Sequence, residues 1–275
     1  KKYYVSSAYV TSKKPASAGA VQTTSQTAAG AQTSGGTAIA LSSNYKYANY
    51  SKINSGTATL YRSTASNKKN KVVCVNAGHG TNGGGSAKVT GGTTGAGATS
   101  AVAVSSGMTF ADGTAESKVT LAMAKVLKTK LLNAGYDVLM IRESDDVQLD
   151  NIARTVIANN NADCHIALHW DSTSSNKGAF FMSVPSNATY RAMEPVASHW
   201  KQHNQLGESL ISGLKSAGVK IYSKGSMEMD LTQTSYSTIP GVDIELGDKA
   251  SDHSGATLET LANGLLAGVN TFFGQ

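Results

Sequence analysis

The sequence predicts an α/β fold in which a mostly parallel sheet is covered by helices on both faces. From Lys71 onward, short apolar runs alternate with longer segments whose apolar residues recur at helical spacing. Strands that alternate with helices are typical of parallel sheets, because each crossover helix packs back onto the sheet. At 275 residues, the chain is long enough for one large domain, or for one medium domain with an appended segment.

The expected helices and strands follow from this periodicity. A helix is expected over residues 115–133, because Val119, Met123 and Leu127 lie on one face. It follows a long Gly/Ser/Thr/Ala-rich loop at residues 80–113. The expected strands are at residues 72–76, 136–141, 164–169, 178–184, 219–222 and 242–246. The other expected helices are at residues 149–160, 190–217 and 257–272.

Residues 1–70 are dominated by Ser, Thr, Ala, Gly, Lys and Tyr, so we place a boundary near Lys71. Tracts such as residues 23–36 are typical of linkers. However, seven of the eleven tyrosines lie in residues 1–70, and solvated linkers rarely contain aromatic residues. We therefore expect residues 1–70 to be either a linker or an extension packed on a domain at residues 71–275.

The net charge of +6 is carried by scattered basic residues, apart from Lys68, Lys69 and Lys71. Nucleic-acid binders usually concentrate such residues on one element, so we expect no nucleic-acid partner. The mild positive charge suits either solubility alone or a diffuse polyanion. The chain contains no run close to the ~18 consecutive apolar residues of a membrane span.

The two cysteines, Cys74 and Cys164, each lie in an expected buried strand. Two cysteines make neither a disulfide framework nor a metal cluster. They are either small buried core residues or a disulfide, if the two strands are neighbours.

Two histidines follow strands that are expected to end at the same edge of the sheet. His79 lies in a Gly-His-Gly turn after the first strand, and His169 ends the third. Functional residues of open α/β sheets gather beyond the carboxyl ends of the strands, so both imidazoles can reach one pocket. With Glu116, in the first turn of the helix after the glycine-rich loop, they make a donor set that leaves a fourth position for water on a catalytic zinc. Glu245, on the last strand, is the candidate for taking and relaying a proton.

Each of these residues has a simpler interpretation when taken alone. A carboxylate in the first turn of a helix, such as Glu116, often only complements the helix dipole. His169 alone fits a polar residue at a strand end. Glu245 is the least expected of the set, because burying a carboxylate without a partner is costly.

Four further histidines lie outside this set. His165 shares a face with His169 and is either a core residue or a substitute ligand. His199 and His203 are four residues apart on a helix, a spacing that can bind metal. The pair has no adjacent glutamate and no evident third ligand, which favours a solvated helical face. His253 is either a surface residue or part of the mouth of the pocket.

Several motifs stand in order along residues 71–275. They are the strand and Gly-His-Gly turn at 72–80, Glu116 opening a helix, Gly135-Tyr136-Asp137-Val138 before Arg142, Arg154 with Ala158-Asn159, Ala162-Asp163, the strand ending in His169, and Ile244-Glu245-Leu246-Gly247 before the final helix. Together they resemble the zinc-dependent N-acetylmuramoyl-L-alanine amidases of the type-3 family, which are found in cell-wall hydrolases and endolysins.

This resemblance implies that His79, Glu116 and His169 hold Zn²⁺ and that Glu245 is the catalytic glutamate. It implies cleavage of the amide between the lactyl group of N-acetylmuramic acid and L-alanine of the stem peptide. The implied fold is a mixed, mostly parallel sheet flanked by helices. We therefore expect a secreted monomer that acts on peptidoglycan in the cell wall, with its signal peptide outside this chain and anionic cell-wall polymers as a further candidate partner.

The chain departs from the family pattern at three places near the expected site. It has Asn76-Ala77 where the family usually has Asp-Pro before Gly-His-Gly. The loop between His79 and Glu116 is longer than usual, and Trp170-Asp171 follows His169 where a small residue and Asn are commoner. These differences concern substrate detail and leave the expected ligands in place.

Two other functions fit the same residues. A zinc peptidase or another amide hydrolase would keep the metal and cleave a different bond. A wall-binding protein with a degenerate site would cleave nothing.

Overall fold

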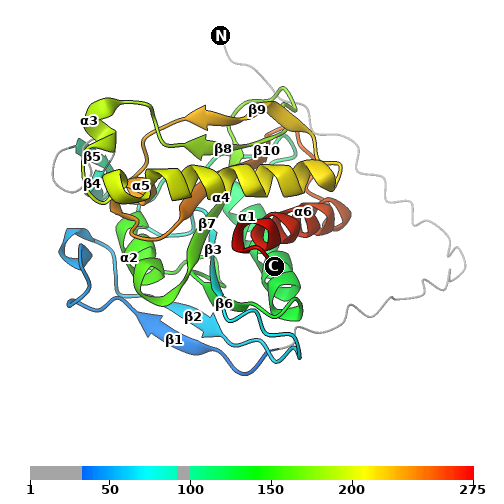
Figure 1. The fold of residues 1–275 in the computed structure, drawn as a ribbon. Helices are drawn as coiled ribbons and strands as arrows, with labels where there is room; N and C mark the ends of the chain where they lie inside the picture. Colours follow the sequence, from blue (N-terminus) through cyan, green and yellow to red (C-terminus); the bar gives the residue numbers. More distant parts are fainter. Residues whose placement is uncertain (1–32, 92–98) are drawn as a thin grey trace, which may run out of the picture. The chain divides into compact units, whose positions relative to one another are not determined.

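The computed structural model describes residues 33–91 and 99–275, and the expectations for residues 1–32 lie outside them. Eight strands form one sheet in the order β1-β2-β6-β3-β7-β10-β8-β9 (Figure 1). They are β1 (Thr37–Ala40), β2 (Thr57–Tyr61), β3 (Val72–Ala77), β6 (Asp137–Met140), β7 (Cys164–Asp171), β8 (Ala179–Ser183), β9 (Ile221–Glu228) and β10 (Gly241–Asp248).

The sheet is mixed and mostly parallel, as predicted. Its central strands β6, β3, β7 and β10 are parallel to one another, and β8 is parallel to β9. Antiparallel pairing joins β8 to β10, β2 to β6 and β1 to β2. The parallel centre brings the carboxyl ends of β3, β7 and β10 to one edge of the sheet, where sites gather in such folds.

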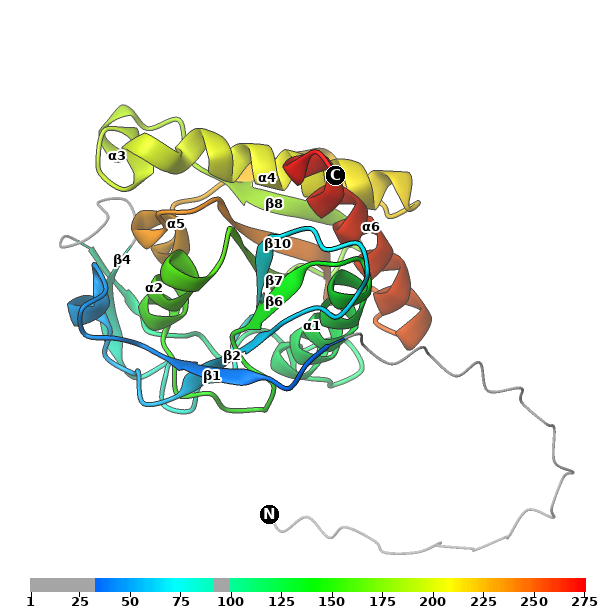
Figure 2. The same cartoon turned by 60° about the horizontal axis from the view of Figure 1, so that its bottom comes forward.

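Helices cover both faces of the sheet, which confirms the predicted architecture (Figures 1 and 2). On one face, α1 (Glu116–Asn133), α4 (Val196–Ser216) and α6 (Gly255–Phe273) bury their apolar side chains against the strands. On the other face lie α2 (Asn151–Asn161) and α5 (Thr232–Tyr236). The predicted helices at 115–133, 149–160 and 257–272 are therefore present with small shifts at their ends.

The strand register separates the two cysteines. Val73 pairs with Cys164 across β3 and β7, and both side chains join the core under α1 and α6. Cys74 faces the opposite side and packs under α2. Both thiols are free and buried, which confirms the core interpretation and excludes the bridge. Burial raises the pKa of each thiol well above its usual value.

Residues 33–70 contribute two strands, β1 and β2, to the same sheet as the strands after Lys71. Strand β1 is largely exposed at the sheet edge and needs no large aliphatic side chains, which explains why composition alone did not reveal it. Tyr47 and Tyr50 pack on Tyr236 of α5, with ring centroids 5.5 Å and 5.7 Å away.

Three expectations need correction. The loop predicted at 80–113 contains a separate hairpin, β4 (Lys88–Gly91) and β5 (Thr99–Val102). The helix predicted at 190–217 is two helices, α3 (Ala188–Arg191) and α4, because Pro195 lacks a backbone N–H and restrains the residue before it. The strand predicted at 219–222 continues as β9 to Glu228.

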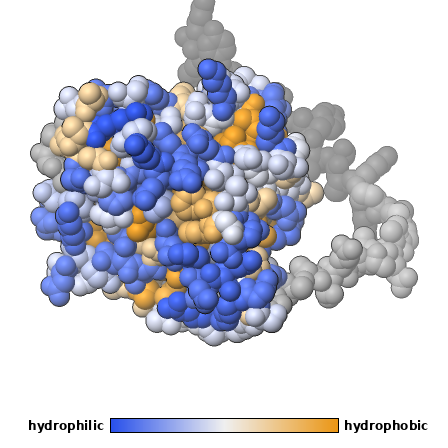
Figure 3. Space-filling view, in the orientation of Figure 1, coloured by the Kyte–Doolittle hydropathy of each residue, from blue (hydrophilic) through white to orange (hydrophobic). Residues whose placement is uncertain are grey.

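The visible surface is mostly hydrophilic, with hydrophobic residues in separate patches (Figure 3). Among the described residues, no helix has the length and apolar character needed to cross a membrane.

Candidate metal centre

The Gly-His-Gly turn stands directly after β3 and packs closely on β7. His79 has a backbone φ of 63°, a conformation uncommon outside glycine. A Cβ atom on Gly78 would lie within 2.7 Å of three ring atoms of His169, so a larger residue would displace either the turn or the imidazole. The sequence Gly78-His79-Gly80 therefore allows the close approach that brings the two imidazoles together.

Two buried arginines hold the backbone of this turn. Arg154, on α2, donates to the carbonyl oxygens of His79 at 2.6 Å and Ala77 at 3.2 Å. Arg142, after β6, donates to those of Ala77 at 3.0 Å and Gly78 at 2.8 Å. Burial lowers the pKa of Arg154 to about 9 and that of Arg142 to about 10, so both remain cationic at neutral pH.

Sequence reasoning used these arginines only as part of a family pattern and missed their structural role. Arg154 lies within a run of buried, mostly apolar residues of α2. A charged residue within such a run was the available signal, because a buried guanidinium must find hydrogen-bond acceptors.

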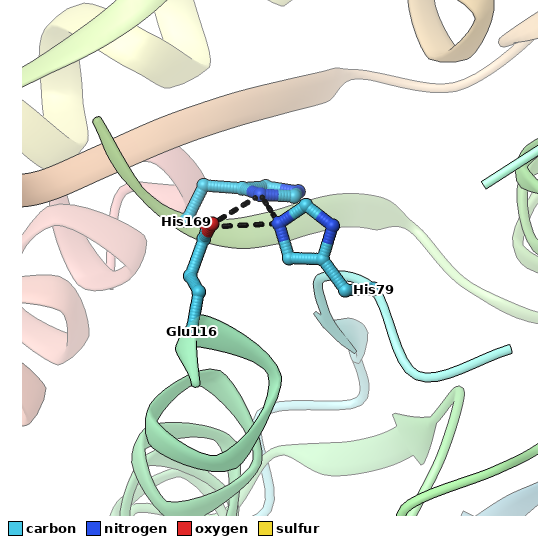
Figure 4. Close-up of side chains that lie close together, drawn as sticks. All are labelled: His79, Glu116 and His169. Atoms are coloured by element: carbon cyan, nitrogen blue, oxygen red, sulfur yellow. Dashed lines mark hydrogen bonds and ion pairs between the residues drawn. The ribbon is translucent and has the colours of Figure 1, made fainter. Parts of the chain in front are cut away.

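The structure brings His79, Glu116 and His169 together at the carboxyl edge of the sheet (Figure 4). Nε2 of His79 lies 2.9 Å from Oε1 of Glu116 and 3.0 Å from Nδ1 of His169. The same Nδ1 lies 3.1 Å from Oε1 of Glu116. One atom from each side chain thus points at a common centre, and the three residues can hold a metal ion.

The hydrogen bonding of His79 supports a cation at this centre. Its Nδ1 lies 2.9 Å from the carbonyl oxygen of Ser105, which only accepts, so Nδ1 carries the proton. In the neutral ring, Nε2 then directs a lone pair at the Glu116 carboxylate, an unfavourable contact unless a cation lies between them. Ligand atoms of a tetrahedral zinc with bonds of ~2.0–2.1 Å lie about 3.3–3.4 Å apart, slightly farther than the 2.9–3.1 Å observed here. The donor set fits a metal ion such as zinc, which the ligand atoms would accommodate by moving slightly apart.

Two backbone N–H groups hold the carboxylate of Glu116 in place. Its Oε2 accepts the N–H of Met108 at 2.8 Å, and its Oε1 accepts that of Trp170 at 3.0 Å. Burial raises the pKa of Glu116, but the neighbouring imidazoles of His169 and His79 outweigh this, so the pKa lies below its usual value. The side chain is ionised at neutral pH and only 3% exposed.

Glu245 and Asp243 lie on β10 beside His169. In the parallel pairing of β10 with β7, Glu245 stands opposite His169, and Asp243 stands opposite Ala167. Burial, and then Asp243, raise the pKa of Glu245 well above its usual value. Burial lowers the pKa of His169, but Asp243, Glu116 and Glu245 raise it to about 9. Oε2 of Glu245 is buried and has no hydrogen-bond partner among the described residues.

These residues line a pocket of about 560 Å³. One part of its lining consists of His79, Glu116 and His169, together with Asp243 and Glu245. Val102 of β5 contributes from the hairpin, and Thr232 and Gln233 contribute from α5. Met182 at the end of β8 and Met229 after β9 add apolar surface. The long segment after His79 therefore shapes the site.

The remaining histidines lie elsewhere. His165 is fully buried, and burial lowers its pKa to about 3, which identifies it as a core residue. His203 was expected on a solvated face but is buried, because it shares the sheet-facing stripe of α4 and accepts the N–H of Gly241 at 2.9 Å. His253 pairs with Asp112 at 3.2 Å and is not part of the pocket lining. Strand β7 continues to Asp171, so its side chains still alternate at Trp170. The Trp170 side chain therefore packs in the core, on the face opposite to that of His169.

Solved structures with a similar fold are amidases. Ami1 from Mycobacterium abscessus is 20% identical with a TM-score of 0.60, and the alignment covers 74% of this chain and 98% of that one. Ami1 from Mycobacterium smegmatis is 19% identical with a TM-score of 0.63, covering 76% and 99%. The CwlD amidase from Clostridioides difficile, in complex with the GerS lipoprotein, is 18% identical with a TM-score of 0.54, covering 74% and 99%. These likenesses show the shared fold.

A comparison with curated proteins gave no match. The family model described as N-acetylmuramoyl-L-alanine amidase matches residues 73–262. This range begins in β3, ends in α6 and includes the four residues of the site, Glu245 among them. The match spans most of the chain, which therefore belongs to the type-3 N-acetylmuramoyl-L-alanine amidases, hydrolases that cleave an amide bond of peptidoglycan.

Proposed function

We propose that this amidase is zinc-dependent, and that His79, Glu116 and His169 hold the zinc. The observation that carries the proposal is the convergence of Nε2, Oε1 and Nδ1 within 2.9–3.1 Å of one another. Two histidines and one carboxylate are a donor set used by catalytic zinc sites, in which a fourth position is left for water or substrate.

The bond to be broken joins the lactyl group of N-acetylmuramic acid to L-alanine. Zinc, when bound, supplies a Lewis acid that polarises a carbonyl and lowers the pKa of a water to ~7. We assign Glu245 the role of taking a proton from the attacking water and returning it to the L-alanine nitrogen as the amide breaks. Its place beside His169 in the pocket supports this role.

Two glutamine substitutions separate metal binding from proton transfer. Glu245→Gln should retain about one zinc per chain and lower kcat by ~10²–10⁴, the usual contribution of a general acid–base residue. Glu116→Gln keeps the side-chain volume but loses the charge that faces both histidines, so its zinc content should fall. Zinc analysis and turnover on peptidoglycan measure both effects. If Glu245→Gln loses zinc, or keeps wild-type kcat, the assigned roles are wrong.

We further propose that the protein is secreted and acts as a monomer in the cell wall, with anionic wall polymers as a secondary partner. The net charge of +6 supports the last point. Attraction of this kind is screened by salt, so binding to isolated walls should weaken as ionic strength rises. Binding that is independent of salt would contradict it.

A further inference from the structure

We propose that Asp243 is a positioning residue that fixes the tautomer and orientation of His169 and thereby strengthens metal binding. The inference rests on the proposed zinc site. Asp243 is neither one of the proposed ligands nor the proposed proton carrier. The inference depends on the register of β10 against β7 and on which groups face the two ring nitrogens of His169.

The register of β10 against β7 places Asp243 in the lining of the pocket. Side chains alternate along a strand, so Asp243 and Glu245 share a face, as Ala167 and His169 do on β7. The parallel pairing sets Glu245 opposite His169 and sets Asp243, two residues earlier, opposite Ala167. Asp243 therefore approaches His169 from the neighbouring strand, while Glu116 approaches it from α1.

The imidazole of His169 lies between two acidic groups. Its Nδ1 faces His79 and Glu116, and its Nε2 lies 3.6 Å from Oδ2 of Asp243. This is an ion-pair contact, longer than a hydrogen bond. Among residues 33–91 and 99–275, the Asp243 carboxylate is the acidic group that forms an ion-pair contact with Nε2. A neutral imidazole has one N–H, and Asp243 favours its placement on Nε2, which leaves the lone pair of Nδ1 free for a metal.

Asp243 has one ion-pair partner among the described residues, which is His169. Its Oδ1 is buried without a hydrogen-bond partner, and no lysine or arginine of the described chain forms an ion pair with it. A buried carboxylate in this state destabilises a fold. Asp171, in the same pocket, differs because Lys177 lies 2.8 Å from its Oδ2. The unfavourable environment of Asp243 is accounted for if the side chain serves His169 and its metal.

The test is the zinc affinity of the full-length protein, stripped of metal and titrated with Zn²⁺ against a competing chelator. Asp243→Asn keeps the volume and one acceptor oxygen but loses the charge, whereas Asp243→Leu also loses the acceptor. Outer partners of a ligating histidine typically contribute 10–100-fold to metal affinity. We expect Kd to rise about 10-fold or more in Asp243→Asn and further in Asp243→Leu. Asp171→Asn, the matched control, should leave Kd within a factor of about three, because Asp171 contacts no ligand.

Thermal unfolding of the metal-free proteins separates positioning from a structural role. The inference expects metal-free Asp243→Asn to unfold cooperatively like the wild type, so that a rise in its zinc Kd reports on the site and not on loss of the fold. An unchanged zinc Kd in Asp243→Asn overturns the inference, whatever Asp243→Leu does. If the wild type itself binds no zinc, the proposed function fails. If the wild type binds zinc and the Asp243→Asn protein binds it equally well, only the role of Asp243 fails.

Discussion

Each proposed ligand is held by the protein through one atom and directs another at the common centre. Nδ1 of His79 is bound to the carbonyl of Ser105, and Oε2 of Glu116 accepts the N–H of Met108. Nε2 of His169 faces Asp243. Such outer contacts select which atom of each side chain binds the metal. At the scale of residues, the site is therefore defined as much by these contacts as by the ligands.

The arginine contacts to the histidine turn lead to a prediction at the same scale. Arg154→Lys replaces a planar fork with a single ammonium, which cannot reach all of the acceptors of the guanidinium. Each buried acceptor left unpaired costs ~1–3 kcal/mol, so the free energy of unfolding should fall by at least ~2 kcal/mol. Zinc affinity should fall with it, since the carbonyl of His79 is one of these acceptors. Denaturant unfolding and zinc titration measure the two effects.

Arg62→Lys is the control for this substitution. The Arg62 side chain is 58% exposed and pairs with Asp137 at the surface, and exposed pairs contribute ~0–1 kcal/mol. If both variants lose the same small stability, the buried arginine does not hold the turn.

At the scale of elements, α4 and α6 pack with their backbones in contact. A Cβ atom on Gly213 of α4 would lie 2.4 Å or less from backbone atoms of Gly264 and Gly268 in α6. Gly213→Ala should therefore separate the helices and destabilise the protein by ~1–3 kcal/mol, as overpacking usually does. Gly255→Ala, at the start of α6, has open space and should be neutral or stabilising. Equal unfolding midpoints for the two variants would contradict this packing.

The elements also show what could be predicted from sequence. Strands β3, β7 and β10 were predictable because they are buried on both faces and read as apolar runs. Strand β1 was missed because an exposed edge strand of small residues has no such pattern. His79 and His169 could be proposed as ligands because strand ends converge in this topology. The burial of His203 and the contact between Asp243 and His169 depend on packing and register, which a single sequence does not specify.

At the scale of the whole molecule, buried neutral histidines affect stability in acid. Burial lowers the pKa of His165 and of His203 to about 3, whereas an unfolded histidine titrates near 6.5. Between these values the unfolded chain binds more protons than the folded one, so this contribution to stability falls as the pH drops from ~6.5 toward ~3. Each histidine contributes up to ~1.4 kcal/mol per pH unit.

His165→Leu isolates this effect from the carboxylates, some of which titrate in the opposite sense. The metal-free variant should lose less unfolding free energy between pH 7 and pH 5 than the metal-free wild type. Urea unfolding at the two pH values measures the difference. Parallel pH dependence in the two proteins would show that His165 does not remain neutral when folded.

The central claim is that this chain cleaves the lactyl–L-alanine amide with a zinc held by His79, Glu116 and His169. The most direct measurement is the digestion of purified peptidoglycan by the metal-free protein, with and without stoichiometric Zn²⁺, followed by labelling of new amino termini. The account predicts new L-alanine amino termini on freed stem peptides only when zinc is restored, and none with Glu116→Gln. Intact lactyl–L-alanine bonds in the zinc-loaded digest, or equal cleavage without metal, would contradict it.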